Sequence, residues 1–260
     1  MAPKVVPKMV PGTFSAFSGK KALVIGGTGG IGKAVALGLA IRGAEVVVQG
    51  GSSQKRLDDT LRALGENGVN AAGFLHFIES PASAEEIMAR FAAITGSETP
   101  DILVCAWGPF KQGALDALDR EFWQKMTENN LIFPGILVSL ALRGMIQRKW
   151  GRILLFGGTN TDTIRGFTST AAYSAAKTAL GVIAKSAAKS AGAHGVTCNV
   201  VCPGLTETEY TSEDQIQYYR NKNPDGKPMK AEQIAEAALA ILENPGLNGA
   251  VIPVDKGVIL

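Results

Sequence analysis

The chain has few of the residue types from which metal centres and disulfide frameworks are built. Its 260 residues include three cysteines, Cys105, Cys198 and Cys202, and only two histidines. The cysteines lie in apolar runs, and neither a Cys-x-x-Cys pair nor a histidine cluster has the spacing of metal ligands. We therefore expect no metal site, and we interpret the cysteines as buried thiols in a reducing compartment.

An excess of charge of one sign is also missing. The chain has 26 Lys and Arg residues against 23 Asp and Glu residues, which gives a net charge of +3, and it has no dense basic run. Nucleic acids and anionic membranes attract concentrated positive charge, so neither is expected as a partner. The small charge is explained by solubility alone.

Long apolar runs are absent as well. No apolar run reaches the roughly 18 residues that suggest a membrane span, and the opening segment lacks the continuous apolar core of a secretory signal. Prolines in that segment disfavour a helix. We therefore expect residues 1–18 to form a flexible arm, residues 19–260 to form one domain, and the protein to be cytoplasmic.

Apolar, strand-like runs alternate regularly with helical stretches along the rest of the chain. Such alternation predicts an α/β fold with a doubly wound (Rossmann) parallel seven-stranded sheet flanked by helices. The strand-like runs lie near residues 21–26, 44–49, 70–78, 101–106, 151–157, 196–202 and 249–254. Ligands of such sheets bind beyond the carboxyl ends of the strands, so we expect the loops after these runs to share one cleft.

The first strand-like run, Lys21–Ile25, leads directly into a glycine-rich turn and then into a helical stretch. Glycines let a ligand approach the main chain, and a helix start offers unpaired N–H groups to a pyrophosphate. This design is typical of a dinucleotide cradle, although its G-x-x-x-G-x-G spacing differs from G-x-G-x-x-G, and a turn without nucleotide is the alternative. The predicted cofactor-binding residues here are Gly26, Thr28, Gly29, Gly30, Ile31 and Gly32.

Tyr173 and Lys177 stand four positions apart at the start of an alanine-rich stretch, so on a helix they share one face. A lysine charge near a tyrosine favours the phenolate and would bring the phenol pKa below its ordinary value of about 10. The pair therefore predicts a general acid/base. The alternative is a surface pair without function, because this spacing is common on helices.

Further landmarks follow in order along the chain: Asp101–Gly108, Asn130–Leu131, Gly151–Ile153 and Pro203–Thr208. Together with the glycine turn and the Tyr-x-x-x-Lys pair, they resemble the short-chain dehydrogenase/reductase family. The resemblance extends over nearly the whole chain after its first 19 residues. The family's most frequent assignment, 3-oxoacyl carrier-protein reductase, serves as a prior for this chain.

The resemblance implies hydride transfer between a nicotinamide cofactor and a small-molecule carbonyl or alcohol substrate. Tyr173 would be the general acid/base, Lys177 would lower its pKa and hold the nicotinamide ribose, and Asn130 would anchor a water leading protons to solvent. For Asn130 the alternative is an amide that bonds its own backbone. The cofactor contacts that the resemblance implies at later strand ends are Ala106, Trp107, Gly108, Tyr173, Lys177, Pro203, Gly204, Thr206 and Thr208.

The turn after the second strand-like run favours NADP(H) over NAD(H). An acidic residue there would bond the ribose of NAD and repel a 2′-phosphate, but this turn holds Gly51, Ser52 and Ser53 and no carboxylate. The hydroxyls can donate hydrogen bonds, and Lys55 and Arg56 add positive charge. The alternative is that Ser53 only caps the next helix while the two basic residues face solvent.

A further position, Glu79, lies near the place where the family usually has an adenine-binding aspartate. We count it among the cofactor-binding residues that the resemblance implies.

One member of the family's usual catalytic set is missing. Counting forward from Gly151–Ile153 places the family's serine at Gly158, whereas counting back from Tyr173 places it at Asn160. Thr159 lies between, and its hydroxyl can hydrogen-bond a substrate oxygen as charge develops there. Thr159 is therefore our prediction for this role, with the Asn160 amide or a plain surface loop as alternatives.

Another departure from the family pattern raises a second hypothesis. Trp107 replaces a small residue beside the expected nicotinamide pocket, where it would narrow the site or reject the cofactor. With the absent serine, this leaves a non-catalytic nucleotide-binding or sensor protein as the alternative function. We also expect a homodimer or homotetramer, although the tail Val254–Gly257 departs from the family's usual Asp-Gly-Gly, so its subunit contacts are expected to differ.

Overall fold

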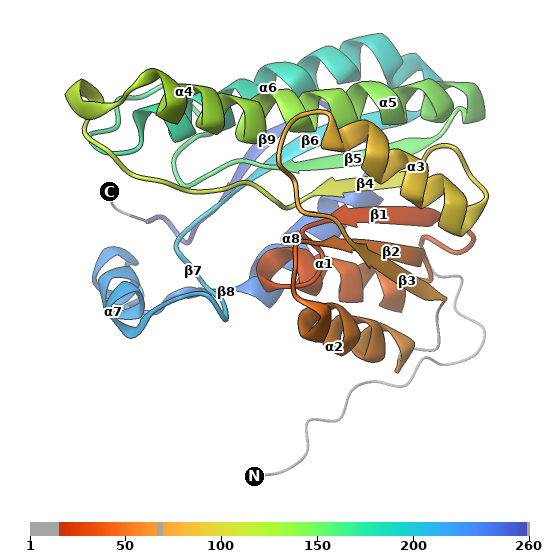
Figure 1. Cartoon of the computed structure of the whole chain (residues 1–260), viewed down its shortest axis with the longest axis horizontal. Helices are drawn as coiled ribbons and strands as arrows, with labels where there is room; N and C mark the ends of the chain where they lie inside the picture. The colour runs from red at the N-terminus through yellow and green to blue at the C-terminus, as the bar shows by residue number, and fades with distance from the viewer. Residues whose placement is uncertain (1–15, 67–69, 259–260) are drawn as a thin grey trace.

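A computed structural model of the chain describes residues 16–66 and 70–258, so most of the expected arm, residues 1–15, lies outside the described residues. The main sheet has seven parallel strands in the order β3-β2-β1-β4-β5-β6-β9, with helices on both faces (Figure 1). This confirms the predicted doubly wound fold. The strands are β1 (Lys21–Ile25), β2 (Glu45–Gly50), β3 (Ala71–Leu75), β4 (Ile102–Cys105), β5 (Gly151–Phe156), β6 (Val196–Pro203) and β9 (Val251–Val254).

Helices cover the sheet in two layers (Figure 1). One layer consists of α1 (Gly30–Ile41), α2 (Gln54–Gly65) and α8 (Ala231–Glu243). The opposite layer consists of α3 (Ser83–Thr95), α4 (Arg120–Thr127), α5 (Phe133–Arg148) and α6 (Ala171–Ala191). A separate piece, which holds β7 (Thr206–Glu207), α7 (Glu213–Lys222) and β8 (Met229–Lys230), lies apart from the main sheet.

The sheet is buried on both faces because its strands alternate between two apolar clusters. In β1, Leu23 and Ile25 pack with α3, α5 and α6, whereas Ala22 and Val24 pack with α1, α2 and α8. A strand covered on both faces must be apolar throughout, which explains why these runs lack a polar alternation. Phe17, in the segment assigned to the arm, is also buried in the second cluster.

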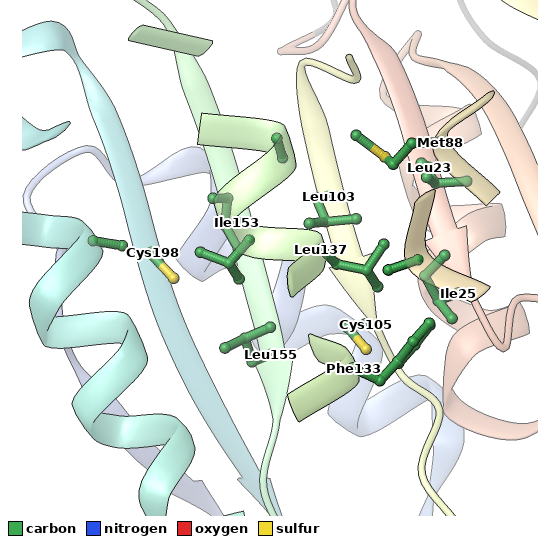
Figure 2. Close-up of a cluster of buried hydrophobic side chains, with 14 of the residues drawn as sticks. Leu23, Ile25, Met88, Leu103, Cys105, Phe133, Leu137, Ile153, Leu155 and Cys198 are labelled. Atoms are coloured by element: carbon green, nitrogen blue, oxygen red, sulfur yellow. The ribbon is translucent and has the colours of Figure 1, made fainter. Parts of the chain in front are cut away.

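Figure 2 shows the first cluster, in which Cys105 and Cys198 lie among branched side chains. All three cysteines of the chain are buried and unpaired. Burial raises the pKa of the Cys105 thiol to about 11 and that of Cys198 to about 12. These thiols are therefore inert packing groups at neutral pH.

One helical stretch, Arg120–Arg148, is long and apolar enough to cross a membrane by length and composition alone. Phe133 and Leu137 of this stretch are fully buried in the first cluster. A core helix of a globular domain satisfies the same test, and this burial accounts for its apolar character.

Candidate active site

The glycine turn connects β1 to α1, and its backbone packs too closely to leave room for side chains at some positions. Gly26 has a positive φ of 72°, which favours glycine. A Cβ on Gly32 would lie 2.3 Å from the carbonyl oxygen of Gly26, so no side chain fits there. The turn thus places the first N–H groups of α1 at the sheet edge where strands end, as an anion cradle requires.

Gln49, at the end of β2, fixes this turn from beside it. Its Oε1 accepts from the Gly26 N–H at 3.0 Å, and its Nε2 donates to the carbonyl oxygens of Gly50 and His76 at 2.9 and 2.6 Å. The side chain is buried and fully satisfied. Sequence reasoning did not single out Gln49 as a support for the turn, although a glutamine inside an apolar strand is the signal that could have found it.

A cavity of about 450 Å³ opens beside the turn. Thirteen of the predicted cofactor residues line it: Gly26, Thr28, Gly29, Gly30, Ile31, Gly32, Gly51, Ser52, Ser53, Ala106, Trp107, Gly108 and Thr208. Glu79 is not among the lining residues, and Phe77 and Ile78 reach the cavity in its place. The cavity also includes Arg56, from the first turn of α2.

The two basic residues near the β2 turn differ in their surroundings. Lys55 extends along α2 to pair with Asp59 at 2.6 Å and is highly exposed, whereas the Arg56 side chain lines the cavity. Ser53 does cap α2, because its Oγ accepts from the Arg56 N–H at 3.4 Å. Each of the two interpretations of this turn therefore holds in part. Ser53 caps the helix, as the alternative had it, and Arg56 lines the cofactor cavity, as a phosphate-binding turn requires.

Trp107 leaves room in the cavity. Its ring packs edge-on against Phe133 of α5, with ring centroids 5.5 Å apart, and it adjoins the first apolar cluster. The ring therefore forms a wall of the open 450 Å³ space. The groups that line the cavity, a glycine turn at a helix N-terminus with Ser52 and Arg56 beside it, suit a dinucleotide whose phosphates can reach them.

Tyr173 and Lys177 lie on the first turns of α6, one helical turn apart. Lys177 is buried, and its Nζ donates to the Phe156 carbonyl oxygen at 2.9 Å. The same Nζ lies 5.8 Å from the centroid of the Tyr173 ring. Phe110 packs edge-on against that ring with centroids 5.0 Å apart.

Asn130 belongs to a π-helical turn, η2 (Glu128–Ile132), and is fully buried. Its Nδ2 donates to the Pro109 carbonyl oxygen at 3.1 Å. Its Oδ1 is buried with no partner among the residues that the structure describes. A Cβ on Gly108 would lie 2.3 Å from this Oδ1 and 2.8 Å from Lys177 Nζ, so both groups converge on Gly108. An unpartnered acceptor beside an ammonium suits a bound water.

The electrostatics of the pair differ from the expectation. Burial raises the pKa of Tyr173, and the nearby Cys202 thiol adds to the effect. Burial also lowers the pKa of Lys177 to about 8. Lys177 Nζ is held by the Phe156 carbonyl and lies 5.8 Å from the centroid of the Tyr173 ring, so loss of hydration outweighs its attraction for a phenolate. The phenol is thus protonated at neutral pH, ready to act as an acid.

The position that faces the Tyr173 hydroxyl is Gly158. A Cβ there would lie 3.0 Å from Tyr173 Oη. Thr159 lines the neighbouring cavity, but its hydroxyl donates to the Pro203 carbonyl oxygen at 3.0 Å. Asn160 lines the same cavity and has a positive φ of 61°. The Thr161 hydroxyl holds the loop by bonding both the N–H and the carbonyl of Gly158, at 2.8 and 2.9 Å.

A second cavity, of about 990 Å³, adjoins the first on the Tyr173 side. Pro203, Gly204 and Thr206, which were predicted as cofactor contacts, line this cavity and not the 450 Å³ one, whereas Thr208 lines both. Apolar and aromatic walls come from Phe110, Leu205, Tyr218 and Tyr219, the last two from α7. In the two described ranges, no group of three or more His, Cys, Asp or Glu side chains could hold a metal ion.

Known proteins show the same arrangement over most of the chain. Residues 20–218 match the family model described as short chain dehydrogenase. The 3-oxoacyl-(acyl-carrier-protein) reductase of Escherichia coli is 34% identical over 248 residues, which cover 93% of this chain and 98% of the relative. The 2-dehydro-3-deoxy-D-gluconate 5-dehydrogenase of Formosa agariphila is 28% identical over 250 residues, covering 93% of each chain.

Solved structures agree. A short-chain dehydrogenase/reductase from Serratia marcescens has a TM-score of 0.84 at 27% identity and covers 93% of this chain and 98% of its own. A variant of actinorhodin polyketide ketoreductase with NADPH has a TM-score of 0.82 at 28% identity, covering 94% and 98%. The chain belongs to the short-chain dehydrogenase/reductase family.

Membership defines the class of reaction. The chain is an oxidoreductase that interconverts a carbonyl group and an alcohol, as the expected function had it. The relatives described above are named reductases and dehydrogenases, and they lend no support to the non-catalytic alternative.

Proposed function

We propose that this enzyme uses NADP(H) in preference to NAD(H), with Tyr173 as the general acid/base. The observation that carries the cofactor preference is Arg56, which lines the cofactor cavity beside a β2 end that has Gln49 and no carboxylate. Its guanidinium contacts Tyr210, another residue of that lining. Guanidinium groups bind phosphate through directed, charge-assisted hydrogen bonds. Ser52, which also lines the cavity, adds a hydroxyl donor.

When bound, the nicotinamide cofactor supplies or accepts the hydride. In reduction, the Tyr173 hydroxyl donates its proton to the substrate oxygen as negative charge develops there. The Lys177 ammonium then faces a phenolate and stabilises it. Asn130 Oδ1 accepts a hydrogen bond from a water that links Lys177 to solvent. Gly108 supports this proton path because its lack of a side chain leaves space for Asn130 Oδ1 and Lys177 Nζ.

Gly158 has no side chain that could donate to the substrate oxygen, so other groups must orient the substrate. Thr159 remains our candidate donor to the substrate oxygen, and it takes that role by releasing the Pro203 carbonyl. The Asn160 amide is the second candidate because it lines the same cavity. The absence of a serine hydroxyl at the position facing Tyr173 predicts a slower proton transfer than in a site with that donor.

The substrate class we propose is a chain-bearing ketone, with 3-oxoacyl thioesters as its first member to test. The reductase relative from Escherichia coli is named for such a substrate, and the cavity of about 990 Å³ has room for more than a small ketone. Phe110 and Leu205 offer apolar contacts for an acyl chain. Arg165 and Lys222 also line this cavity, so a sugar acid, the substrate named for the Formosa relative, is the second class to test.

We also propose that the enzyme is a cytoplasmic homodimer or homotetramer. A groove of about 540 Å³ between α5 and α6 is lined mostly by apolar side chains. In it, Val182 is 68% exposed and Ile132 is 43% exposed. Contiguous exposed apolar surface of this kind marks association sites. The buried, unpaired cysteines are consistent with a reducing compartment.

The decisive experiment is NADPH and NADH oxidation with a panel of 3-oxoacyl thioesters, simple ketones and sugar acids. Tyr173→Phe is the control, because it removes the hydroxyl and leaves the ring against Phe110. We expect NADPH-dependent turnover that the substitution removes while NADPH binding is spared. Unchanged turnover in Tyr173→Phe would refute the assignment.

A further inference from the structure

The N-terminus of α1 already has an anionic partner within the chain. Both carboxylate oxygens of Glu209 accept from the Gly30 N–H, at 3.0 and 3.1 Å. The two residues are 179 positions apart. A Cβ on Gly29 would lie 2.5 Å from Glu209 Oε1, so the carboxylate rests directly on the turn. This is the place where the turn would hold a pyrophosphate.

The next residue, Tyr210, contacts the Arg56 guanidinium, which is the group that we assign to the 2′-phosphate of the cofactor. Arg56 Nη1 donates to Tyr210 Oη at 3.2 Å, and the guanidinium carbon lies 4.6 Å from the centroid of the tyrosine ring. The hydroxyl reaches over the turn as well, because it would lie 2.0 Å from a Cβ on Gly29. Tyr210 thus spans both phosphate-binding features.

We infer that Glu209 and Tyr210 form an internal plug, which holds the phosphate positions of the cofactor site and must leave before a dinucleotide binds. The inference rests on the proposed function, since it assigns the occupied groups to cofactor phosphates. The carboxylate takes the position of the pyrophosphate on the Gly30 N–H, and the phenol takes that of the 2′-phosphate on Arg56. Sterically and electrostatically, plug and cofactor exclude each other.

The plug is built as a compact turn that can move as a unit. The Thr208 N–H donates to Thr211 Oγ1 at 2.9 Å, and the Tyr210 N–H donates to Thr208 Oγ1 at 3.3 Å. The turn lies between β7 and α7, both outside the main sheet. Neither of these bonds involves the cofactor turn, so displacement can leave them intact. It breaks the contacts that Glu209 and Tyr210 make with Gly30 and Arg56 and separates Thr208 from Gly30. The same segment also lines the substrate cavity through Thr208, which links cofactor entry to the shape of the substrate site.

Because the cofactor binds only molecules in which the plug has left, its apparent affinity is the intrinsic affinity multiplied by the fraction of molecules whose site is open. Removing the plug therefore tightens binding. We expect Glu209→Ala to lower the Kd for both NADPH and NADH about 10-fold, equivalent to about 1.4 kcal/mol. Tyr210→Ala frees Arg56 and lowers the Kd for NADPH more than that for NADH.

The experiment has two arms that share one control, Glu213→Ala, which removes the same charge four residues further along and outside both contacts. The first arm measures hydrogen exchange of the Gly30 amide and of segment 205–212 without any ligand. Glu209→Ala should speed this exchange relative to both the wild type and the control. Equal exchange in all three proteins would overturn the inference.

The second arm titrates the same proteins with NADPH and with NADH by calorimetry. Tighter binding by Glu209→Ala alone supports the plug. Equal affinities in wild type, Glu209→Ala and Glu213→Ala overturn it and leave the proposed function standing. If none of the proteins binds either dinucleotide, both the plug and the proposed function fail.

Discussion

Lys177→Met is expected to make the folded protein more stable while removing its activity. The lysine is 5% exposed, and burial lowers its pKa from 10.5 to about 8. At about 1.4 kcal/mol for each pKa unit, holding the charge in the fold costs roughly 3 kcal/mol at neutral pH. Methionine has a similar length and no charge. Loss of the bond to the Phe156 carbonyl offsets roughly half of the gain.

The sign of the pH dependence follows from the lowered pKa. Below pH 8 the folded state carries the full penalty of the charged lysine, and the penalty disappears as pH rises from about 8 toward 10.5, where the unfolded lysine also loses its proton. The advantage of Lys177→Met should therefore shrink over this range. The buried thiols act in the opposite direction above pH 9, because burial raises their pKa values. Cys198 contributes equally to both proteins, whereas Lys177 lowers the pKa of Cys105, so the Cys105 contribution is larger in the variant.

Urea unfolding of wild type, Lys177→Met and Lys185→Met at pH 7 and pH 9.5 measures these differences. Lys185 lies on the exposed side of the same helix and controls for charge removal. We expect Lys177→Met to unfold with a free energy about 1–2 kcal/mol above wild type at pH 7. A variant less stable than wild type at pH 7, with a difference that does not change with pH, would refute the burial argument.

Substitutions at Arg56, Gly158 and Gly32 test the cofactor and proton sites, with Lys55→Ala as a control. Arg56→Ala removes the proposed 2′-phosphate partner together with one contact of the plug, so in calorimetric titrations the affinity for NADPH relative to NADH should fall about 10-fold, whereas Lys55→Ala should leave this ratio unchanged. Both Gly158→Ser and Gly158→Ala crowd Tyr173, but only the serine adds a donor, so in steady-state assays its turnover should exceed that of the alanine variant about 10-fold or more; equal rates would contradict the donor argument. Gly32→Ala should abolish NADPH binding, checked by fluorescence titration, because its methyl group would lie 2.3 Å from a backbone oxygen.

Much of the fold could be predicted because its causes are local in sequence. β1 is apolar from Ala22 to Ile25, since Leu23 and Val24 enter different clusters, and such a run between helical patterns indicates a buried parallel strand. The glycine turn and the Tyr173–Lys177 spacing are equally local. Each of these features is visible within a window of a few residues, so the sequence alone places them correctly.

Features that depend on distant contacts could not be predicted. Nothing near Glu209 in the sequence indicates that its carboxylate meets Gly30, 179 positions away. The charges of Lys55 and Arg56 look equivalent in sequence, yet Asp59 draws one along α2 and the other faces the cavity. Which side chain a cavity receives depends on packing between elements, and a local pattern carries no information about it.

The shift of the Tyr173 pKa is opposite to the one that the Tyr-x-x-x-Lys spacing predicts. Spacing puts Lys177 on the same helix face as the phenol, and this predicts a lowered pKa. The lysine head is held instead by the Phe156 carbonyl, 5.8 Å from the centroid of the Tyr173 ring. One cause, burial, raises the pKa of the tyrosine and lowers that of the lysine. Polar groups of a cofactor and substrate entering between them would shift both pKa values back toward each other. The acid/base function is therefore a property of the loaded site, and the motif supplies only the two groups that the ligands bring into balance.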